Sequence, residues 1–193
     1  NKAAHAKLTA DINLSDLQDG DPDKTNWMPI GNYSYSNMNL YYSGTFDGDG
    51  HKITGLTING AVTNAGLFGY LKGGTVKDLT LEALSITVSE TGIDGMDTAA
   101  GGIAGYSEDG TAENCSVIGN SEISGPKNAG GIFGYTYGAK AVNCSYDGKV
   151  AAVNAGGIFG YANGGARASS CSNSGAVESP EYAGGIVGRI WAD

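Results

Sequence analysis

Basic residues and long apolar runs are scarce in this sequence, and each shortage excludes a class of partner. The 193 residues include 11 lysines and arginines against 20 aspartates and glutamates, which gives a formal net charge of −9. An acidic chain repels the phosphates of nucleic acids, so we expect no nucleic-acid partner. No apolar run approaches the ~20 residues that cross a bilayer as a helix, so we expect no membrane-spanning segment.

Proline is also rare, with four residues, whereas glycine is abundant, with 33. Collagen needs glycine at every third position, and low-complexity disorder usually combines glycine with proline, so neither class describes this chain. Glycines placed regularly between apolar residues are instead typical of turns and close backbone approaches in β structure.

A repeated heptapeptide, Ala-Gly-Gly-Ile-Phe-Gly-Tyr at residues 129–135, is the main feature that the sequence does contain. Variants of it occupy residues 64–70, 100–106, 155–161 and 183–189. The last glycine of each copy, in chain order, is Gly69, Gly105, Gly134, Gly160 and Gly188, so the steps are 36, 29, 26 and 28 residues. A repeat of this period indicates a solenoid.

Each repeat divides into three short strand-like segments separated by glycine-rich turns. In the third copy these are the heptapeptide, the segment 141–144 and the segment 148–153. No helical periodicity lies between them, so a crossover of alternating strands and helices is excluded. We therefore predict an all-β fold, a parallel β-helix with three short strands per coil, in which equivalent side chains stack into columns.

Several columns follow from this stacking. An isoleucine column is expected to line the interior; it contains Ile103, Ile132, Ile158 and Ile186. The direction of the next column, Phe68, Phe133 and Phe159, is left open. Strict alternation along the strand would point it away from the core, whereas a bulge at a glycine would change that direction. Asn64, Asn128 and Asn154 are expected to turn a corner in left-handed geometry. Residues 6–15 alternate as one half-buried strand, and residues 89–97 are read as an insertion that protrudes as a loop.

The cysteines occupy one slot of the repeat. Cys115, Cys144 and Cys171 follow their glycines by 10, 10 and 11 residues, and Leu79 holds the same place after Gly69. A slot shared by cysteine and leucine predicts a small buried apolar position. Stacked coils place such thiols ~4.8 Å apart in a line, which suits neither a disulfide nor a tetrahedral zinc site. We expect no metal and no cofactor.

The repeated Gly-Gly-Ile-Phe-Gly-Tyr, followed by Asn-Cys-Ser and Gly-x-Val, resembles the GLUG repeat of bacterial surface proteins. Residues 27–31 and 44–53 also look like the segment that often precedes such repeats. The resemblance covers residues 8–188 and implies a right-handed β-helix at the cell surface or outside the cell, as found in large adhesins and in non-catalytic regions of immunoglobulin A peptidases. It supplies no catalytic residue. We expect one continuous domain, with capping coils at 1–60 and repeats at 61–193, as a fragment of a longer chain.

Three groups of residues are candidates for sites, each with a plain structural alternative. Asp47, Asp49 and His51 suggest a metal or acid–base site, but a glycine-rich turn explains them better. Asp19, Asp21 and Asp23 have the spacing of a calcium loop but lack its glycine and glutamate, so a solvated loop is preferred. Aromatic residues suggest either sugar stacking or structural packing. These are Trp27, Tyr33, Tyr35, Tyr41, Tyr42, Tyr70, Tyr106, Tyr135 and Tyr161.

The function indicated by this pattern is a non-catalytic adhesive or spacer module of a bacterial cell-surface protein that binds a glycan or a host or matrix protein. The alternative is a polysaccharide lyase or hydrolase, because many such enzymes are β-helices, although fold alone does not grant activity. Ice binding is a remote alternative. It needs regular threonine columns, whereas Thr57, Thr75, Thr80, Thr87 and Thr111 do not fall into one slot of the repeat.

Overall fold

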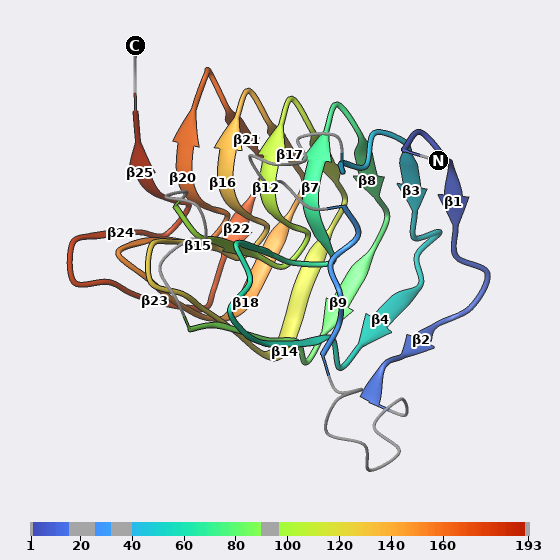
Figure 1. Cartoon of the computed structure of the whole chain (residues 1–193), viewed down its shortest axis with the longest axis horizontal. Coiled ribbons are helices and arrows are strands. Elements are labelled where there is room, and N and C mark those ends of the chain that lie inside the picture. The colour runs from blue at the N-terminus through green and yellow to red at the C-terminus, as the bar shows by residue number, and fades with distance from the viewer. Residues whose placement is uncertain (1, 16–25, 32–39, 90–96, 192–193) are drawn as a thin grey trace.

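The chain winds into about five coils that stack side by side, from the N-terminal end at the right of Figure 1 to the C-terminal end at the left. The computed structural model describes residues 2–15, 26–31, 40–89 and 97–191, which contain strands and no α-helix. Neighbouring coils pair through parallel strands that stay in register, apart from one shift between Val117 and Ser121. The predicted all-β parallel β-helix is confirmed.

Four walls surround the core, one more than the three strands per coil that the sequence predicts. The additional wall, here called the short wall, is formed by the residues that precede the Gly-Ile corner of each repeat. It contains β6 (Asn64–Ala65), β11 (Ala99–Gly101), β15 (Asn128–Gly130), β19 (Asn154–Gly156) and β24 (Tyr182–Gly184).

The tyrosine wall follows the short wall in each coil and begins at the phenylalanine position rather than at the preceding isoleucine. It contains β7 (Phe68–Lys72), β12 (Ala104–Glu108), β16 (Phe133–Tyr137), β20 (Phe159–Asn163) and β25 (Val187–Ile190).

The threonine wall comes next and ends two residues before the cysteine slot. It contains β1 (Ala6–Lys7), β3 (Thr45–Asp47), β8 (Thr75–Lys77), β13 (Thr111–Glu113), β17 (Lys140–Val142) and β21 (Arg167–Ser169). Its outward column runs in register from Thr45 through Thr75 and Thr111 and continues as Lys140 and Arg167. Two of the threonines that the sequence treats as out of step therefore do align, but the column is interrupted by cations.

The long wall closes each coil. It contains β2 (Ile12–Asn13), β4 (Lys52–Thr54), β5 (Thr57–Gly60), β9 (Thr80–Glu82), β10 (Ser85–Val88), β14 (Ser116–Ser124), β18 (Ser145–Ala151), β22 (Ser172–Asn173) and β23 (Ala176–Glu178). Early coils break the wall at Gly55 and Ala83, which hold positive φ values of 74° and 51°. In β14 and β18 the strand instead runs through, with a shift in register between Val117 and Ser121.

The phenylalanine column points inward together with the isoleucine column, which answers the question that alternation left open. Ile132 and Phe133 are both fully buried. The amide nitrogens of these two residues donate to the same carbonyl, that of Ile158 in the next coil, at 3.1 and 3.0 Å. Two successive amides that share one acceptor bend the chain at this corner as a bulge does, so two adjacent side chains face the core.

We expected the asparagines before the Ala-Gly motif to turn a corner in left-handed geometry, and this expectation is wrong. They lie in the strands of the short wall and are buried. The Asn154 side-chain amide donates to Asn128 Oδ1 at 2.7 Å, and Asn128 donates to the Thr98 carbonyl at 3.1 Å. A buried amide needs such partners, and stacking supplies them from coil to coil.

The first residues of the chain form two short strands rather than the single strand predicted over 6–15. β1 pairs with β3 on the threonine wall, whereas β2 pairs with β4 on the long wall. Leu8 and Leu14 pack against the core, but Ala10 and Ile12 remain exposed. The coil turns between the walls, so a regular alternation in sequence does not give one continuous strand.

Candidate functional site

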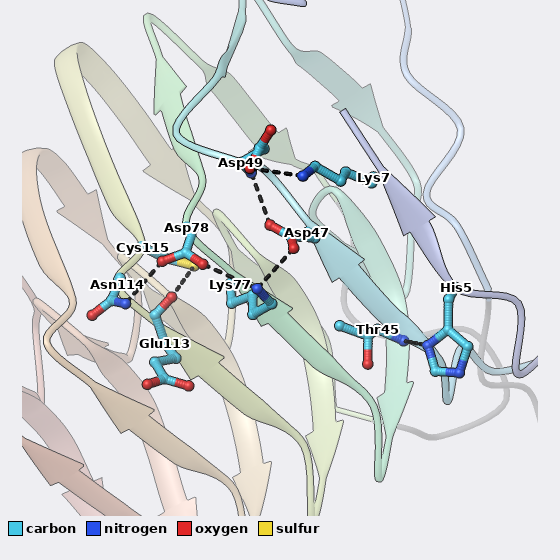
Figure 2. A network of polar contacts seen from close by, with 10 residues as sticks. All are labelled: His5, Lys7, Thr45, Asp47, Asp49, Lys77, Asp78, Glu113, Asn114 and Cys115. Carbon is cyan, nitrogen blue, oxygen red and sulfur yellow. Dashed lines mark hydrogen bonds and ion pairs between the residues drawn. The ribbon is translucent and has the colours of Figure 1, made fainter. Parts of the chain in front are cut away.

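A chain of polar contacts connects three coils at the corner between the threonine wall and the long wall (Figure 2). Lys77 lies at its centre, with its Nζ 2.7 Å from Asp47 Oδ2 and 3.2 Å from Asp78 Oδ2. Asp47 also accepts a hydrogen bond from the backbone amide of Asp49 at 2.9 Å, and Asp49 forms an ion pair with Lys7 at 2.9 Å. These contacts neutralise each carboxylate with a specific partner.

The same corner continues as a ladder of amides. Asn114 donates to Asp78 Oδ1 at 2.8 Å, and Asn143 donates to Asn114 Oδ1 at 3.2 Å. Sequence reasoning missed this ladder, although a signal was present. The residues directly before Leu79, Cys115, Cys144 and Cys171 are Asp, Asn, Asn and Ser, which tolerate the left-handed geometry that all four adopt.

The candidate acid–base group of Asp47, Asp49 and His51 does not assemble into one site. Asp47 faces Lys77 and Asp49 faces Lys7, whereas His51 Nδ1 lies 3.1 Å from Asp11 Oδ1. Asp49 and Gly50 hold positive φ values of 51° and 80°, as a tight turn requires. The turn predicted from these residues is present, and the three side chains have separate structural partners.

The ionisation of the carboxyl groups disfavours general acid catalysis. Hydrogen bonds from Lys77 and then from the Asp49 amide hold the pKa of Asp47 below its usual range. Burial opposes ionisation of Glu108, but hydrogen bonds from Tyr70 and Lys72 outweigh it, so the pKa of Glu108 is also lowered. Among the described residues, every carboxyl group with a resolved shift is shifted downward. A glycosidase acid needs the opposite shift.

The cysteines form the predicted internal column. The Cys115 and Cys144 side chains are buried and Cys171 is half-buried, and all three thiols are free. Each sulfur lies 3.4 to 3.5 Å from a carbonyl oxygen of the preceding coil. The neighbouring Cys115 thiol, together with burial, raises the pKa of Cys144 to about 12, so this column is unsuited to nucleophilic chemistry. The described residues contain no group of three or more ligands that could hold a metal ion.

The tyrosines of the repeat stack along the tyrosine wall. Ring centroids are 4.9 Å apart for Tyr70 and Tyr106, 5.3 Å for Tyr106 and Tyr135, and 4.9 Å for Tyr135 and Tyr161. The guanidinium of Arg189 continues the stack, 5.6 Å from the Tyr161 ring centroid. A sugar stacks on an open ring face, but here each inner ring has a neighbour on both sides along the stack. The column therefore packs as a structural element.

The other candidate aromatics also serve packing. Tyr42 is buried, stacks on Phe68 at 4.8 Å and donates its hydroxyl to the Ala4 carbonyl at 2.7 Å. The Trp27 indole donates to the Leu67 carbonyl at 3.1 Å, and the Tyr41 ring meets Tyr70 edge-on at 5.8 Å. Tyr33, Tyr35, the calcium-loop candidates Asp19, Asp21 and Asp23, and residues 90–96 of the insertion lie outside the described residues.

A further surface was not identified from the sequence. Two hollows lie along the coils that contain β14, β18 and β23, one over the long wall and one at the corner where these strands end. One hollow, of about 440 Å³, is lined mainly by polar residues, and the other, of about 530 Å³, is mainly apolar. The sequence signal was a polar residue beside glycine in the middle of three successive segments, at residues 119–120, 147–148 and 174–175.

Comparison with known proteins finds a solved structure that is similar to this chain. The chain matches no protein-family model and none of the curated protein sequences. It is similar to the crystal structure of a "putative immunoglobulin A1 protease" from Bacteroides ovatus, with 25% sequence identity and a TM-score of 0.77. That likeness is consistent with the immunoglobulin A peptidase link implied by the repeat, whereas the GLUG repeat itself stays a prediction. The similarity covers all of this chain but only 57% of the Bacteroides ovatus chain.

Proposed function

We propose that this chain is a non-catalytic adhesive or spacer module of a bacterial cell-surface protein. The observation that carries the proposal is that the side chains with candidate chemical roles contact partners within the stack of coils. Asp47, Asp78 and Glu82 each bind a lysine, and the thiols and tyrosines pack in columns. A regular stack held in this way suits an extended surface or a spacer.

The structural neighbour supports a modular role. This chain corresponds to 57% of the Bacteroides ovatus protein, so an equivalent module would be one part of a larger protein. Likeness of fold does not carry activity on immunoglobulin A1 over to this chain, because activity belongs to sites rather than to folds. We place the module outside the cell or at its surface, and immunolabelling of intact cells tests that location.

Binding and turnover assays on the same preparation test the proposal. Purified chain is measured against a glycan array, immobilised matrix proteins and immunoglobulin A1, and each ligand is also incubated with the chain and analysed for cleavage. We expect retention of a glycan or protein ligand for an adhesive module and no cleavage of any ligand. Inert behaviour in every binding assay leaves the spacer role, and cleavage of a polysaccharide or of immunoglobulin A1 contradicts the proposal.

No helix in the described part of the chain is long and apolar enough to cross a membrane.

A further inference from the structure

The last described coil leaves one end of the stack open. Its strands β21, β22, β23, β24 and β25 pair with strands of the preceding coil and with no other described strand. Two of them, β24 and β25, lie at the left end of the stack in Figure 1. Edge strands of this kind are templates on which another strand can pair. We call this end of the stack, with the corner between β24 and β25 at its centre, the open face.

Backbone amides at the corner between β24 and β25 lack acceptors. In the preceding coil the amides of Ile158 and Phe159 both donate to the Ile186 carbonyl, at 2.9 Å each. Because Phe159 thus faces β25, its register partner Val187 faces away from β20. The amides of Ile186 and Val187 have no acceptor among the described residues. By equivalence with Ile158 and Phe159, they converge on one place, where an inner coil meets the carbonyl of the next coil.

Gly185, at the same corner, is a glycine that no described neighbour requires. A Cβ at the equivalent Gly131 would lie 2.2 Å from the Gly157 carbonyl oxygen, and a Cβ at Gly157 would lie 2.1 Å from the Gly185 carbonyl oxygen. A Cβ at Gly185 meets nothing within 4 Å, and its φ lies outside the left-handed region. Neither space nor backbone geometry calls for glycine here, whereas the carbonyl of one further strand would call for it.

The core also reaches the open face without a cover. Phe159 is buried, but Val187, the next member of its column, is only half-buried. A hollow of about 170 Å³ lies beside Val187, and its lining includes Phe159, Ile190 and Trp191. In the inner coils Phe133 stacks on Phe159 with ring centroids 5.9 Å apart. The hollow therefore suits a phenyl ring that continues this column.

Arg189 and two exposed aromatic residues border the open face. The guanidinium carbon of Arg189 lies 4.8 Å from the ring centroid of Tyr182 and 5.8 Å from that of Trp191. These two rings are 42% and 51% exposed. Tryptophan, tyrosine and arginine are the residues that dominate binding energy at protein interfaces. The tyrosine stack of the inner coils ends on Arg189, so a further aromatic ring would extend it.

We propose that the open face binds an extended, glycine-rich strand of a partner polypeptide, parallel to β25, with the pattern Gly-Ile-Phe-Gly-Tyr. The carbonyl of the partner's isoleucine accepts from Ile186 and Val187, its phenyl ring fills the hollow, and its tyrosine stacks on Arg189. Strand addition of this kind gains affinity from main-chain hydrogen bonds and specificity from side-chain pockets. The inference does not depend on the proposed adhesive function, since it concerns the end of the stack and not its outer walls.

The partner strand needs glycine after its phenylalanine. A Cβ at Gly160 would lie 2.6 Å from the Ala129 carbonyl oxygen of the preceding coil, and a Cβ at Gly188 would lie 2.6 Å from the Ala155 carbonyl oxygen. A partner strand in the same register meets the backbone of Ala183 in the same way. This requirement distinguishes the proposed strand from other apolar strands that could add to an exposed edge.

The test uses three synthetic peptides, acetylated and amidated at their ends. The first is Asn-Ala-Gly-Gly-Ile-Phe-Gly-Tyr, the sequence of residues 128–135. The second has alanine in place of the last glycine, and the third is the first sequence reversed. Each is added at up to ~1 mM to the ¹⁵N-labelled chain. We expect the first peptide to shift the amide signals of Gly185, Ile186 and Val187 and to slow their hydrogen exchange, because these amides gain acceptors. The other two should bind at least roughly tenfold more weakly.

Gly185→Ala tests the face from the side of this chain. Its Cβ would occupy the place of the partner's carbonyl, so the variant should bind the first peptide at least roughly tenfold more weakly. The same Cβ meets nothing in the chain alone, so the urea midpoint should be unchanged. The matched control is Tyr137→Ala, an exposed position of the tyrosine wall in an inner coil, which should not alter peptide binding.

Three results overturn the inference. The first is that the Gly-Ile-Phe-Gly-Tyr peptide shifts no amide of the open face, or binds no better than the alanine or reversed peptide. The second is unchanged peptide affinity in Gly185→Ala. The third is a dimer in sedimentation experiments in which the amides of Gly185, Ile186 and Val187 are already protected, because a second copy then occupies the face. None of these results bears on the proposed function, which the retention and cleavage assays test separately.

Discussion

Asn114 donates its side-chain amide to Asp78 Oδ1 at 2.8 Å, and both residues have a φ of 52° on neighbouring coils. The hydrogen bond depends on the unusual backbone, because left-handed geometry is what places the two side chains one above the other at the corner. Aspartate and asparagine tolerate this geometry better than other residues with a Cβ. The corner is therefore specified by side chains rather than by glycine.

Asn114→Ala should destabilise the fold by about 2 to 3 kcal/mol. It places alanine in left-handed geometry, at about 1 kcal/mol, and removes the two side-chain hydrogen bonds with Asp78 and Asn143, at about 0.5 to 1 kcal/mol each. Asn114→Gly removes the same two hydrogen bonds but adopts left-handed geometry without strain, so it should cost about 1 kcal/mol less than Asn114→Ala. Urea unfolding followed by circular dichroism measures both variants. Equal destabilisation by alanine and glycine would show that backbone strain makes no contribution at this corner.

Gly131 and Gly185 occupy equivalent positions of the repeat but differ in the room that is available for a side chain. A Cβ at Gly131 would collide with the Gly157 carbonyl oxygen and the Tyr146 ring, whereas a Cβ at the equivalent Gly185 of the last coil meets nothing within 4 Å. Gly131→Ala should therefore cost about 3 kcal/mol or more, as overpacking a rigid interior does. Gly185→Ala should change stability by less than about 0.5 kcal/mol. Comparable urea midpoints for the two variants would contradict the tight stacking described for the inner coils.

Acid should weaken the corner around Lys77. The pKa values of Asp47 and Asp78 are lowered in the folded state, Asp47 chiefly by Lys77 and Asp78 chiefly by Asn114. Their stabilising contribution is complete above the ordinary carboxyl pKa of ~4, and it is lost as the pH falls through the lower folded value. The raised pKa of Lys77 makes its contribution complete below ~10 and lost above it.

Lys77→Met should consequently reduce the loss of stability between ~pH 5 and ~pH 2.5 relative to the unmodified chain, as measured by urea midpoints across that range. Lys140→Met is the matched control, because Lys140 is exposed on the same wall and forms no ion pair with a described residue. If both substitutions change the pH dependence of the urea midpoint equally, the contacts of Lys77 with Asp47 and Asp78 have no specific role in acid sensitivity.

The thiols should resist labelling in the native state. Cys115 and Cys144 are buried, the pKa of Cys144 is about 12, and the pKa of Cys171 is also raised, first by the Cys144 thiol. Because the thiolate is the reactive form, a disulfide reagent at ~pH 7.5 should modify the folded chain very slowly, with half-buried Cys171 the first to react. In denaturant all three cysteines should react promptly. Rapid reaction of two or more thiols in the folded chain would contradict the buried column.

The sequence predicted the parts of the fold that depend on the repeat and missed those that depend on bends. Period and composition were sufficient to predict parallel stacking and the buried column through Leu79, Cys115 and Cys144, because identical coils in register place equivalent residues above each other. Two features were not predictable from alternation: the inward direction of Phe133 after Ile132, and the break of residues 6–15 into two strands. Both arise where the chain changes wall and the period of two is lost.

The candidate sites were harder to predict because chemistry depends on partners from other coils. Asp47 and His51 are four residues apart, but one faces Lys77 and the other Asp11, each some 30 to 40 residues away in sequence. Conversely, Glu122 and Lys149 belong to no shared motif and lie opposite each other only because β14 and β18 pair. A repeat predicts where a residue lies within its coil. Contacts between variable residues of different coils can be predicted only when the pairing register of the strands is known.

Tyr135 tests whether the tyrosine stack stabilises the wall. Its ring lies between Tyr106 at 5.3 Å and Tyr161 at 4.9 Å, whereas Tyr137, two residues later, is 46% exposed. Tyr135→Ala should destabilise the chain by about 2 kcal/mol, since it removes two aromatic contacts of about 1 kcal/mol each. Tyr137→Ala should cost less than about 0.5 kcal/mol. Tyr135→Phe, which keeps the ring, should retain most of the stability in urea unfolding. If Tyr135→Ala and Tyr137→Ala unfold at the same urea concentration, the stacked rings add nothing beyond a solvated surface, and the outer face of the tyrosine wall becomes a candidate for ligand contact.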